Sequence, residues 1–213
     1  EIIRAKIARH KNENDEAREA YAQIIHEGMS HDTTISVAID AMDQQKSRVP
    51  VTATHLAGGF IHKIQLKLTG VIVHGNEFPW SIYVTFPWIK TGANITCTIF
   101  GDMFFKGMFD HKREALIQVD GASDNVCKTN IYFFVMILLV AQEKGMPLRS
   151  ITLSRMKSGH TKFDVDQHWS RTSAYMFGNK RNGHRRRDVF TLSEYETACR
   201  AAHKNMHEYV VLE

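Results

Sequence analysis

The segment Thr-Ile-Ser-Val-Ala-Ile-Asp, residues 34–40, is an apolar run that ends on an aspartate. A second run, Ala-Leu-Ile-Gln-Val-Asp at 115–120, ends in the same way, and a third aspartate, Asp166, closes the block Ser-Gly-His-Thr-Lys-Phe-Asp-Val-Asp at 158–166. Short apolar runs are typical of buried strands, and an acid at the carboxyl end of a strand projects into the crevice where α/β sheets bind ligands. The pattern therefore predicts an α/β sheet whose crevice gathers carboxylates.

Carboxylates held close together repel one another, and a divalent cation relieves this repulsion. Hard oxygen ligands favour Mg²⁺ or Mn²⁺. Asp40, Asp120 and Asp166 are therefore predicted to be catalytic metal ligands, in the manner of two-metal phosphoryl-transfer enzymes. His160, six residues before Asp166, is a further catalytic candidate as a ligand, a general base or a phosphate contact.

Each predicted ligand has an acidic neighbour that could replace it. The pairs are Asp40 and Asp43, Asp120 and Asp124, and Asp164 and Asp166. We prefer Asp40 because it directly follows the apolar run, and residues three apart on a strand face opposite ways. Asp124 and Asp164 also suit the starts of helices, where Asp is favoured as a cap. The sequence leaves open which member of each pair binds metal.

The composition indicates a folded protein of one domain. The chain has 213 residues, 43% of them hydrophobic and 23% charged, with a net charge of +4. Three scattered cysteines make neither a zinc knuckle nor a disulfide framework. The sequence also lacks the motifs of serine hydrolases and P-loop enzymes.

The longest apolar run, 131–141, is too short to cross a bilayer and predicts a core helix. Phe133, Phe134 and Met136 in this helix are predicted core residues. No association with a membrane is predicted.

The periodicity predicts an ordered series of helices and strands. Helices are expected at 1–29, 92–105, 129–143, 164–177 and 193–207, and strands at 33–40, 60–74, 80–86, 114–120 and 148–153. The motif Ser193-x-x-Glu196 predicts the capping box of the last helix. This order matches the ribonuclease-H-like fold, a mixed sheet in which three antiparallel strands continue into two parallel strands, flanked by helices. In that fold the first and fourth strands are neighbours. Residues 1–30 would form a lead-in helix and 31–213 the domain.

Three blocks resemble a known family. They are 39–50 (IDAMDQQKSRVP), 119–130 (VDGASDNVCKTN) and 158–170 (SGHTKFDVDQHWS). They are similar to the ribonuclease-H-like domains of uncharacterised transposon-derived proteins of eukaryotes. The resemblance implies a transposase-like nuclease that cleaves or transfers DNA strands with two metal ions. It supports Asp166 as the third ligand.

Three positions depart from the family pattern. Lys162 replaces the second His of Gly-His-Thr-His, Cys127 replaces Asn, and Trp169 replaces Phe. If the missing His were a ligand, this copy would be impaired. The alternative function is therefore a decayed or domesticated module that keeps the fold and binds nucleic acid or protein.

The run 180–187, Lys-Arg-Asn-Gly-His-Arg-Arg-Arg, is the densest cluster of positive charge. Such a run suits the phosphate backbone of DNA and is also typical of a nuclear localisation signal. The predicted nucleic-acid-binding residues are Lys180, Arg181, Arg185, Arg186 and Arg187. DNA is thus the predicted partner and the nucleus the predicted location, while the oligomeric state is left open.

Overall fold

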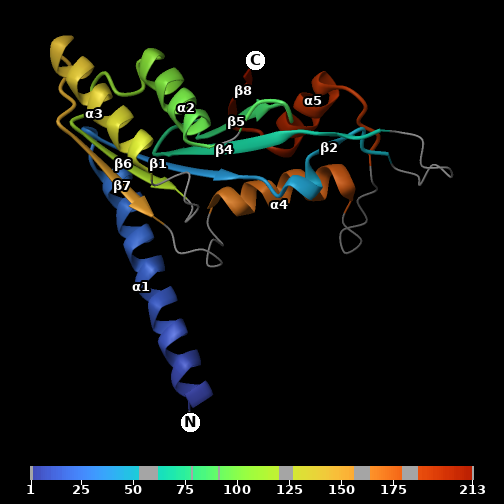
Figure 1. Cartoon of the computed structure of the whole chain (residues 1–213), viewed down its shortest axis with the longest axis horizontal. Coiled ribbons are helices and arrows are strands. Elements are labelled where there is room, and N and C mark those ends of the chain that lie inside the picture. Colours follow the sequence, from blue (N-terminus) through green and yellow to red (C-terminus); the bar gives the residue numbers. More distant parts are fainter. Residues whose placement is uncertain are drawn as a thin grey trace. The chain divides into compact units, whose positions relative to one another are not determined.

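In the computed structural model, the described residues are 2–52, 62–77, 79–90, 92–119, 127–155, 164–178 and 187–212. The helices are α1 (Ile2–Ser30), the short 3₁₀ helix η1 (Gln44–Lys46), α2 (Ala93–Phe105), α3 (Lys128–Glu143), α4 (Asp164–Phe177) and α5 (Leu192–Ala202). The strands are β1 (Thr34–Ala41), β2 (Arg48–Val49), β3 (Ile64–Gln65), β4 (Lys67–His74), β5 (Trp80–Thr85), β6 (Glu114–Val119), β7 (Ser150–Arg155) and β8 (Met206–Leu212). Figure 1 labels most of these elements.

Six strands form one mixed sheet in the order β7-β6-β1-β4-β5-β8. Strands β4 and β5 pair antiparallel, whereas β6 and β7, and also β5 and β8, pair parallel. The predicted ribonuclease-H-like α/β fold is confirmed, and the first strand does lie beside β6, the predicted fourth strand. Strands β2 and β3 form a separate antiparallel pair, in which β3 lies within the predicted strand 60–74 and β2 lies outside every predicted strand.

The chain divides into two compact units. Unit 1 comprises 1–38, 73–75 and 91–161, and unit 2 comprises 39–72, 76–90 and 162–213. Strands β1 and β4 each contribute residues to both units, and the packing of each unit is described separately below.

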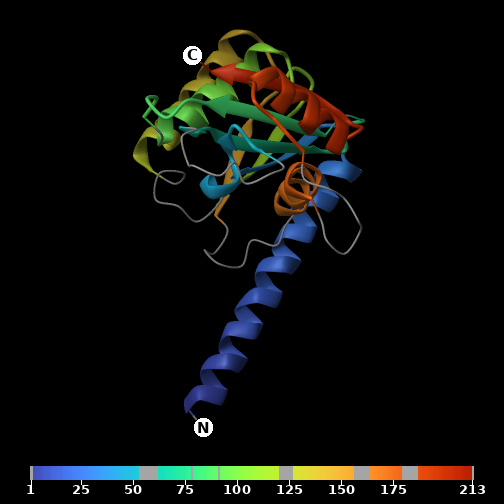
Figure 2. The ribbon, with the colours of Figure 1, turned by 90° about the vertical axis from the view of Figure 1, so that its right-hand side faces the viewer.

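In unit 1, the carboxyl end of α1 lies close to β1. A Cβ on Gly28 would lie 3.0 Å from the backbone nitrogen of Ser36, so only glycine permits this approach. Tyr21 is buried on the same helix, whereas the first three turns of α1 are exposed, including Ile3 and Ile7. Figures 1 and 2 show this first part of the helix extending away from the strands of its unit.

The helices α2 and α3 lie side by side in unit 1. Phe100 of α2 meets Phe134 of α3 edge to face, with ring centroids 5.2 Å apart. Phe134 is therefore a core residue as predicted, and Phe133 is half-buried. The prediction for Met136 is wrong, because its side chain is 56% exposed. Only one face of α3 is covered, so half of this apolar helix lies at the surface.

In unit 2, α4 buries the stripe Val165, Trp169, Thr172 and Met176. These residues recur at spacings of four, three and four, which places them on one helix face. Gly70 of β4 lies directly against Trp80 and Trp169, and its missing side chain makes room for both rings. The helix α4 therefore packs through a narrow aromatic face.

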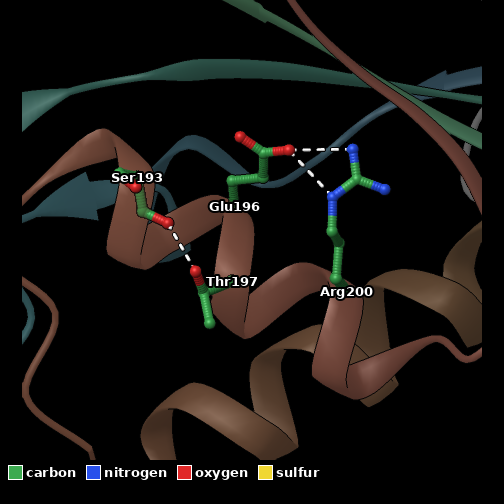
Figure 3. Close-up of polar contacts among 4 residues, drawn as sticks. All are labelled: Ser193, Glu196, Thr197 and Arg200. Carbon is green, nitrogen blue, oxygen red and sulfur yellow. Dashed lines mark hydrogen bonds and ion pairs between the residues drawn. The ribbon is translucent and has the colours of Figure 1, made fainter.

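The helix α5, which contacts α4, begins one residue earlier than predicted. Its capping box is Thr191 with Glu194, not Ser193 with Glu196, because Thr191 has the extended backbone that an N-cap needs. Ser193 and Glu196 instead lie within the helix. The Ser193 carbonyl accepts a hydrogen bond from Thr197 at 2.8 Å, and Glu196 pairs with Arg200 at 2.8 Å (Figure 3).

The predicted extension of this last helix to His207 is also wrong. The helix ends at Ala202, and Met206–Leu212 forms β8, an additional edge strand that pairs with β5. Across the described ranges, none of the helices combines the length and the apolar character that a membrane span requires.

Candidate metal centre

Asp40 lies at the carboxyl end of β1, as the sequence predicts. The strand is buried from Thr34 to Ile39, and Asp40 is the first half-buried residue after this run. Its Oδ1 accepts a hydrogen bond of 2.8 Å from the backbone N–H of Ala41. A carboxylate supplies the hard oxygen donors that Mg²⁺ and Mn²⁺ prefer.

The neighbouring strand β6 starts level with β1. The backbone N–H of Arg113 donates to the carbonyl of Thr33 at 2.6 Å, just before each strand begins. The two strands therefore set out side by side in the same direction. Strand β6 is buried from Ala115 to Val119, and Asp120 comes next in the sequence. Asp120 itself lies outside the described residues.

The third predicted ligand, Asp166, is half-buried in the first turn of α4, together with Asp164. Acids in the first turn of a helix are stabilised by the partial positive charge of the helix N-terminus. Asp164 is the first helical residue, one position inside the cap that the sequence predicts for it. His160 lies outside the described residues.

The described part of the chain brings together no group of three His, Cys, Asp or Glu side chains that could hold a metal ion. Two of the four predicted site residues, Asp120 and His160, belong to ranges that the structure leaves undescribed, so the complete constellation stays a prediction. Within the first alternative pair the structure separates the two acids. Asp43 is exposed and lies beyond β1, where its carbonyl accepts a hydrogen bond of 2.9 Å from the Lys46 backbone at the turn η1.

Of the basic run, only Arg187 is described. Its guanidinium lies over the ring of Tyr175, 4.0 Å from the centroid, and its backbone N–H donates to the carbonyl of Met176 at 3.0 Å. Arg187 is therefore anchored to the last turn of α4, whereas Asp166 lies in the first turn. Lys180, Arg181, Arg185 and Arg186 lie outside the described residues.

Unit 2 contains a cluster of histidine and tryptophan side chains that the sequence did not predict. His168 stacks on Trp80 with ring centroids 4.5 Å apart, and Trp169 meets Trp80 edge to face at 5.0 Å. His203 completes the cluster through its Nδ1, which lies 3.1 Å from Nδ1 of His168, and its Nε2, which lies 2.8 Å from Oγ1 of Thr172. We call these five residues the Trp80–His203 cluster.

Both histidines of this cluster are held neutral. Burial lowers the pKa of His168 to about 4, and the positive charge of Arg171 lowers it further than the charge of Asp164 raises it. Burial also lowers the pKa of His203 to about 4, with smaller contributions from His168 and Arg171. A hydrogen bond between two ring nitrogens needs a donor and an acceptor, which neutral imidazoles provide. The cluster therefore acts as packing.

Comparisons with known proteins give a family and two distant structural likenesses. The crystal structure of the Mos1 strand transfer complex is similar at a TM-score of 0.39 and 11% sequence identity, covering 90% of this chain and 56% of that one. The human cytomegalovirus terminase nuclease domain is similar at a TM-score of 0.26 and 11% identity, covering 84% of this chain and 92% of that domain. The fold is assigned from the strand order of the sheet and not from these likenesses.

No curated protein matches the chain. A family defined only as a domain of unknown function, DUF7869, matches residues 60–212. This match covers β3 to β8 and all helices from α2 onward. Because it spans well over half of the sequence, the chain belongs to the DUF7869 family.

Proposed function

We propose that this chain is the nuclease or strand-transfer domain of a transposase-like protein, acting on DNA with two divalent metal ions. Asp40 and Asp120 would bind or bridge the ions, and Asp166 would hold the second. When bound, Mg²⁺ or Mn²⁺ would activate water or a 3′-hydroxyl and stabilise the leaving oxygen. The residues of the chain would position the ions, and His160 would serve as a metal ligand, as a general base for water or as a phosphate contact.

The observation that carries this proposal is the common starting level of β1 and β6. Thr33 and Arg113 are joined by a hydrogen bond, and seven residues follow each of them up to Asp40 and Asp120. Equal numbers of residues on neighbouring parallel strands reach the same level and the same face of a sheet.

The third ligand is supported by a different observation. Asp166 is half-buried although it is a carboxylate on a helix of largely polar composition. Its first-turn position provides some stabilisation, and a cation would provide more. Asp164 shares this position, so the structure does not choose between the two acids.

The decisive experiment is a cleavage assay on duplex and single-stranded DNA with Mn²⁺. The variants Asp40→Asn, Asp120→Asn and Asp166→Asn are each expected to lower the rate by at least about 100-fold, since even losing a residue that only orients a metal ligand costs 10–100-fold. The matched controls are Asp43→Asn, Asp124→Asn and Asp164→Asn, one for each open pair. Equal loss within a pair would show that our choice within that pair is wrong.

Metal binding can be measured without activity. Millimolar Mn²⁺ is expected to raise the melting temperature, because a ligand at 100 times its Kd stabilises the folded state by about 2.7 kcal/mol. Asp120→Asn is expected to abolish this rise. A chain that binds DNA but shows neither cleavage nor a Mn²⁺ effect would be the decayed module of the alternative reading. A chain with none of the three properties would overturn both readings.

The basic run supports DNA as the substrate, and the anchoring of Arg187 refines its test. Replacing Arg187 would disturb its contacts with α4, so the variant to use is Arg185→Ala with Arg186→Ala. Each phosphate contact contributes about 0.9 to the salt slope on duplex DNA, so this double variant should flatten the slope by up to about 1.8. Unchanged affinity and slope would leave the run as a solvated loop or as an import signal for the proposed nuclear location.

A further inference from the structure

The outer face of α3 is a patch of exposed apolar side chains. Five large residues along it are between 47% and 67% exposed: Ile131, Tyr132, Val135, Met136 and Leu139. Their spacing follows the helix period, so they form one continuous stripe. We call these five residues the outer face of α3. A contiguous apolar patch on a soluble domain marks an interaction surface, whereas a single exposed side chain needs no explanation.

The opposite face of α3 already has its packing partners. Asn130, Phe134, Ile137 and Ala141 are buried. Phe134 contacts Phe100 of α2, and Asn130 accepts a hydrogen bond of 3.2 Å from the thiol of Cys97. The helix is therefore fixed in its unit by one face, and the outer face contributes nothing to that packing.

The charges of α3 indicate what covers the outer face. The helix contains two charged residues, Lys128 at its start and Glu143 at its end, and both are exposed. Each has the sign that its own helix dipole disfavours, because cations suit the C-terminus of a helix and anions the N-terminus. No ion pair joins either of them to another described residue. The next charge, Lys144, is turned toward α2, where it lies 5.8 Å and 5.7 Å from the ring centroids of Phe104 and Phe105.

We propose that the outer face of α3 is a self-association surface, on which a second copy of this chain docks its own α3 in the antiparallel direction. In that arrangement each Lys128 meets the Glu143 of the other copy and also the negative end of its dipole. The same register places Tyr132 opposite Leu139 and Val135 opposite Met136. One alignment therefore matches the charges and the apolar side chains together.

A second copy fits these features because a two-fold interface must be complementary to itself. A stripe with a cation at one end and an anion at the other is complementary to itself only when it pairs antiparallel, because parallel pairing would bring like charges together. Tyrosine and methionine are also enriched in interfaces, whereas charged residues are depleted from their centres. The charges of α3 lie at the rim of the proposed contact. The inference is independent of the metal centre.

The first test is the oligomeric state of the whole chain by sedimentation equilibrium over a range of concentrations. The wild-type chain is expected to dimerise, and Leu139→Glu is expected to raise the dissociation constant at least tenfold, because it places two carboxylates in the apolar centre. Ile7→Glu is the matched control, since Ile7 is an equally exposed aliphatic residue on another helix of unit 1. It should leave the dissociation constant unchanged. Circular dichroism and a melt check that both variants fold.

The second test uses the charges. Lys128→Glu and Glu143→Lys are each expected to weaken the homodimer by severalfold, because like charges then meet twice. The double variant Lys128→Glu with Glu143→Lys should regain most of the wild-type affinity, since opposite charges meet again, although each then faces the end of the partner's helix dipole that disfavours it. Mixing the two single variants should produce a heterodimer, in which every charge again meets its opposite.

Three results would overturn the inference. A wild-type chain that stays monomeric at high concentration has no such interface. A dimer that Leu139→Glu leaves intact uses another surface. A dimer that the double charge exchange fails to restore does not pair its α3 helices antiparallel.

Discussion

The helices α3 and α4 differ in composition and in burial, and the more apolar helix is the one with an exposed face. The helix α3 is almost entirely apolar, yet a whole face of it is exposed. The helix α4 is rich in polar residues, yet it buries Trp169 and Met176 completely or nearly so. Apolar content alone therefore does not predict burial in this protein. The spacing of the apolar residues does predict burial where these residues form a stripe along one helix face.

The physical reason is how far the apolar surface extends around each helix. The helix α4 has apolar residues at spacings of four and three and polar ones elsewhere, so only one orientation buries them. Apolar residues surround α3 on every side, and the sequence cannot say which of its faces meets α2. A helix that is apolar all round is expected to be buried on all sides, which α3 is not within the described chain. The comparison thus predicts large effects of substitutions on α4 and small effects on the outer face of α3.

The largest effect is expected from Trp169→Ala. This side chain is buried against Trp80 and Gly70, and truncating a buried tryptophan costs about 3–5 kcal/mol in the free energy of unfolding. Gln167→Ala is the control, because Gln167 lies on the exposed face of the same helix and should change stability by less than about 0.5 kcal/mol. Urea denaturation followed by circular dichroism measures both. Equal losses would mean that α4 does not pack through one face.

The next effect is a dependence of stability on pH, through His203 in the same cluster. Burial lowers its pKa to about 4 in the folded chain, while an unfolded histidine titrates near 6.5. Between these values the unfolded state binds more protons. Stability should therefore be complete above about pH 6.5 and fall as the pH drops to 4, by roughly 2–3 kcal/mol for this group.

The control for this prediction is an exposed histidine. His203→Gln should lower stability at pH 7, because it breaks the contacts with His168 and Thr172, and should flatten the pH profile. His207→Gln, at a side chain that is 41% exposed, should leave stability at pH 7 unchanged. If the wild-type chain is equally stable at pH 7 and pH 5, His203 is not held neutral in the folded state.

A smaller effect is expected from Gly70→Ala. A Cβ at this position would lie 2.9 Å from Cζ2 of Trp169 and closer still to the ring of Trp80. Both rings would have to shift, and overpacking of a tight core costs about 1–3 kcal/mol. Gly101→Ala is the matched control, since its Cβ would meet only Phe133, at 3.7 Å. If both substitutions are neutral in thermal melts, the Trp80–His203 cluster is looser than its geometry indicates.

The parts of the fold that the sequence predicted are those with local signals. Apolar runs that end on an acid predicted β1 and the level of Asp40, and their order predicted β1 beside β6. Strand β8 was not predicted because no glycine or proline before Met206–Leu212 marks the end of the preceding helix. The capping box was predicted at the wrong residues because Thr191 and Ser193 are each followed by a Glu three residues later, so both positions fit the motif.

The Trp80–His203 cluster could not be predicted for a different reason. Its residues come from β5, α4 and the end of α5, separated by up to 123 positions between Trp80 and His203. A single sequence contains no signal for contacts of that separation. The acidic site, which stays a prediction, could be proposed from the sequence because each acid has a local signal, either the end of an apolar run or the start of a helix.

The smallest effect, and the sharpest test of the comparison, is expected from Met136→Ala in the monomer. Met136 is 56% exposed on the outer face of α3, so truncation in a Leu139→Glu background should change the free energy of unfolding by less than about 0.5 kcal/mol. Phe134→Ala in the same background is the control, since it removes a ring packed on Phe100 and should cost about 3–5 kcal/mol. In the wild-type background Met136→Ala should instead weaken self-association. If Met136→Ala destabilises the monomer as much as Phe134→Ala does, part of the same chain covers the outer face, and α3 is buried on all sides as its composition alone would predict.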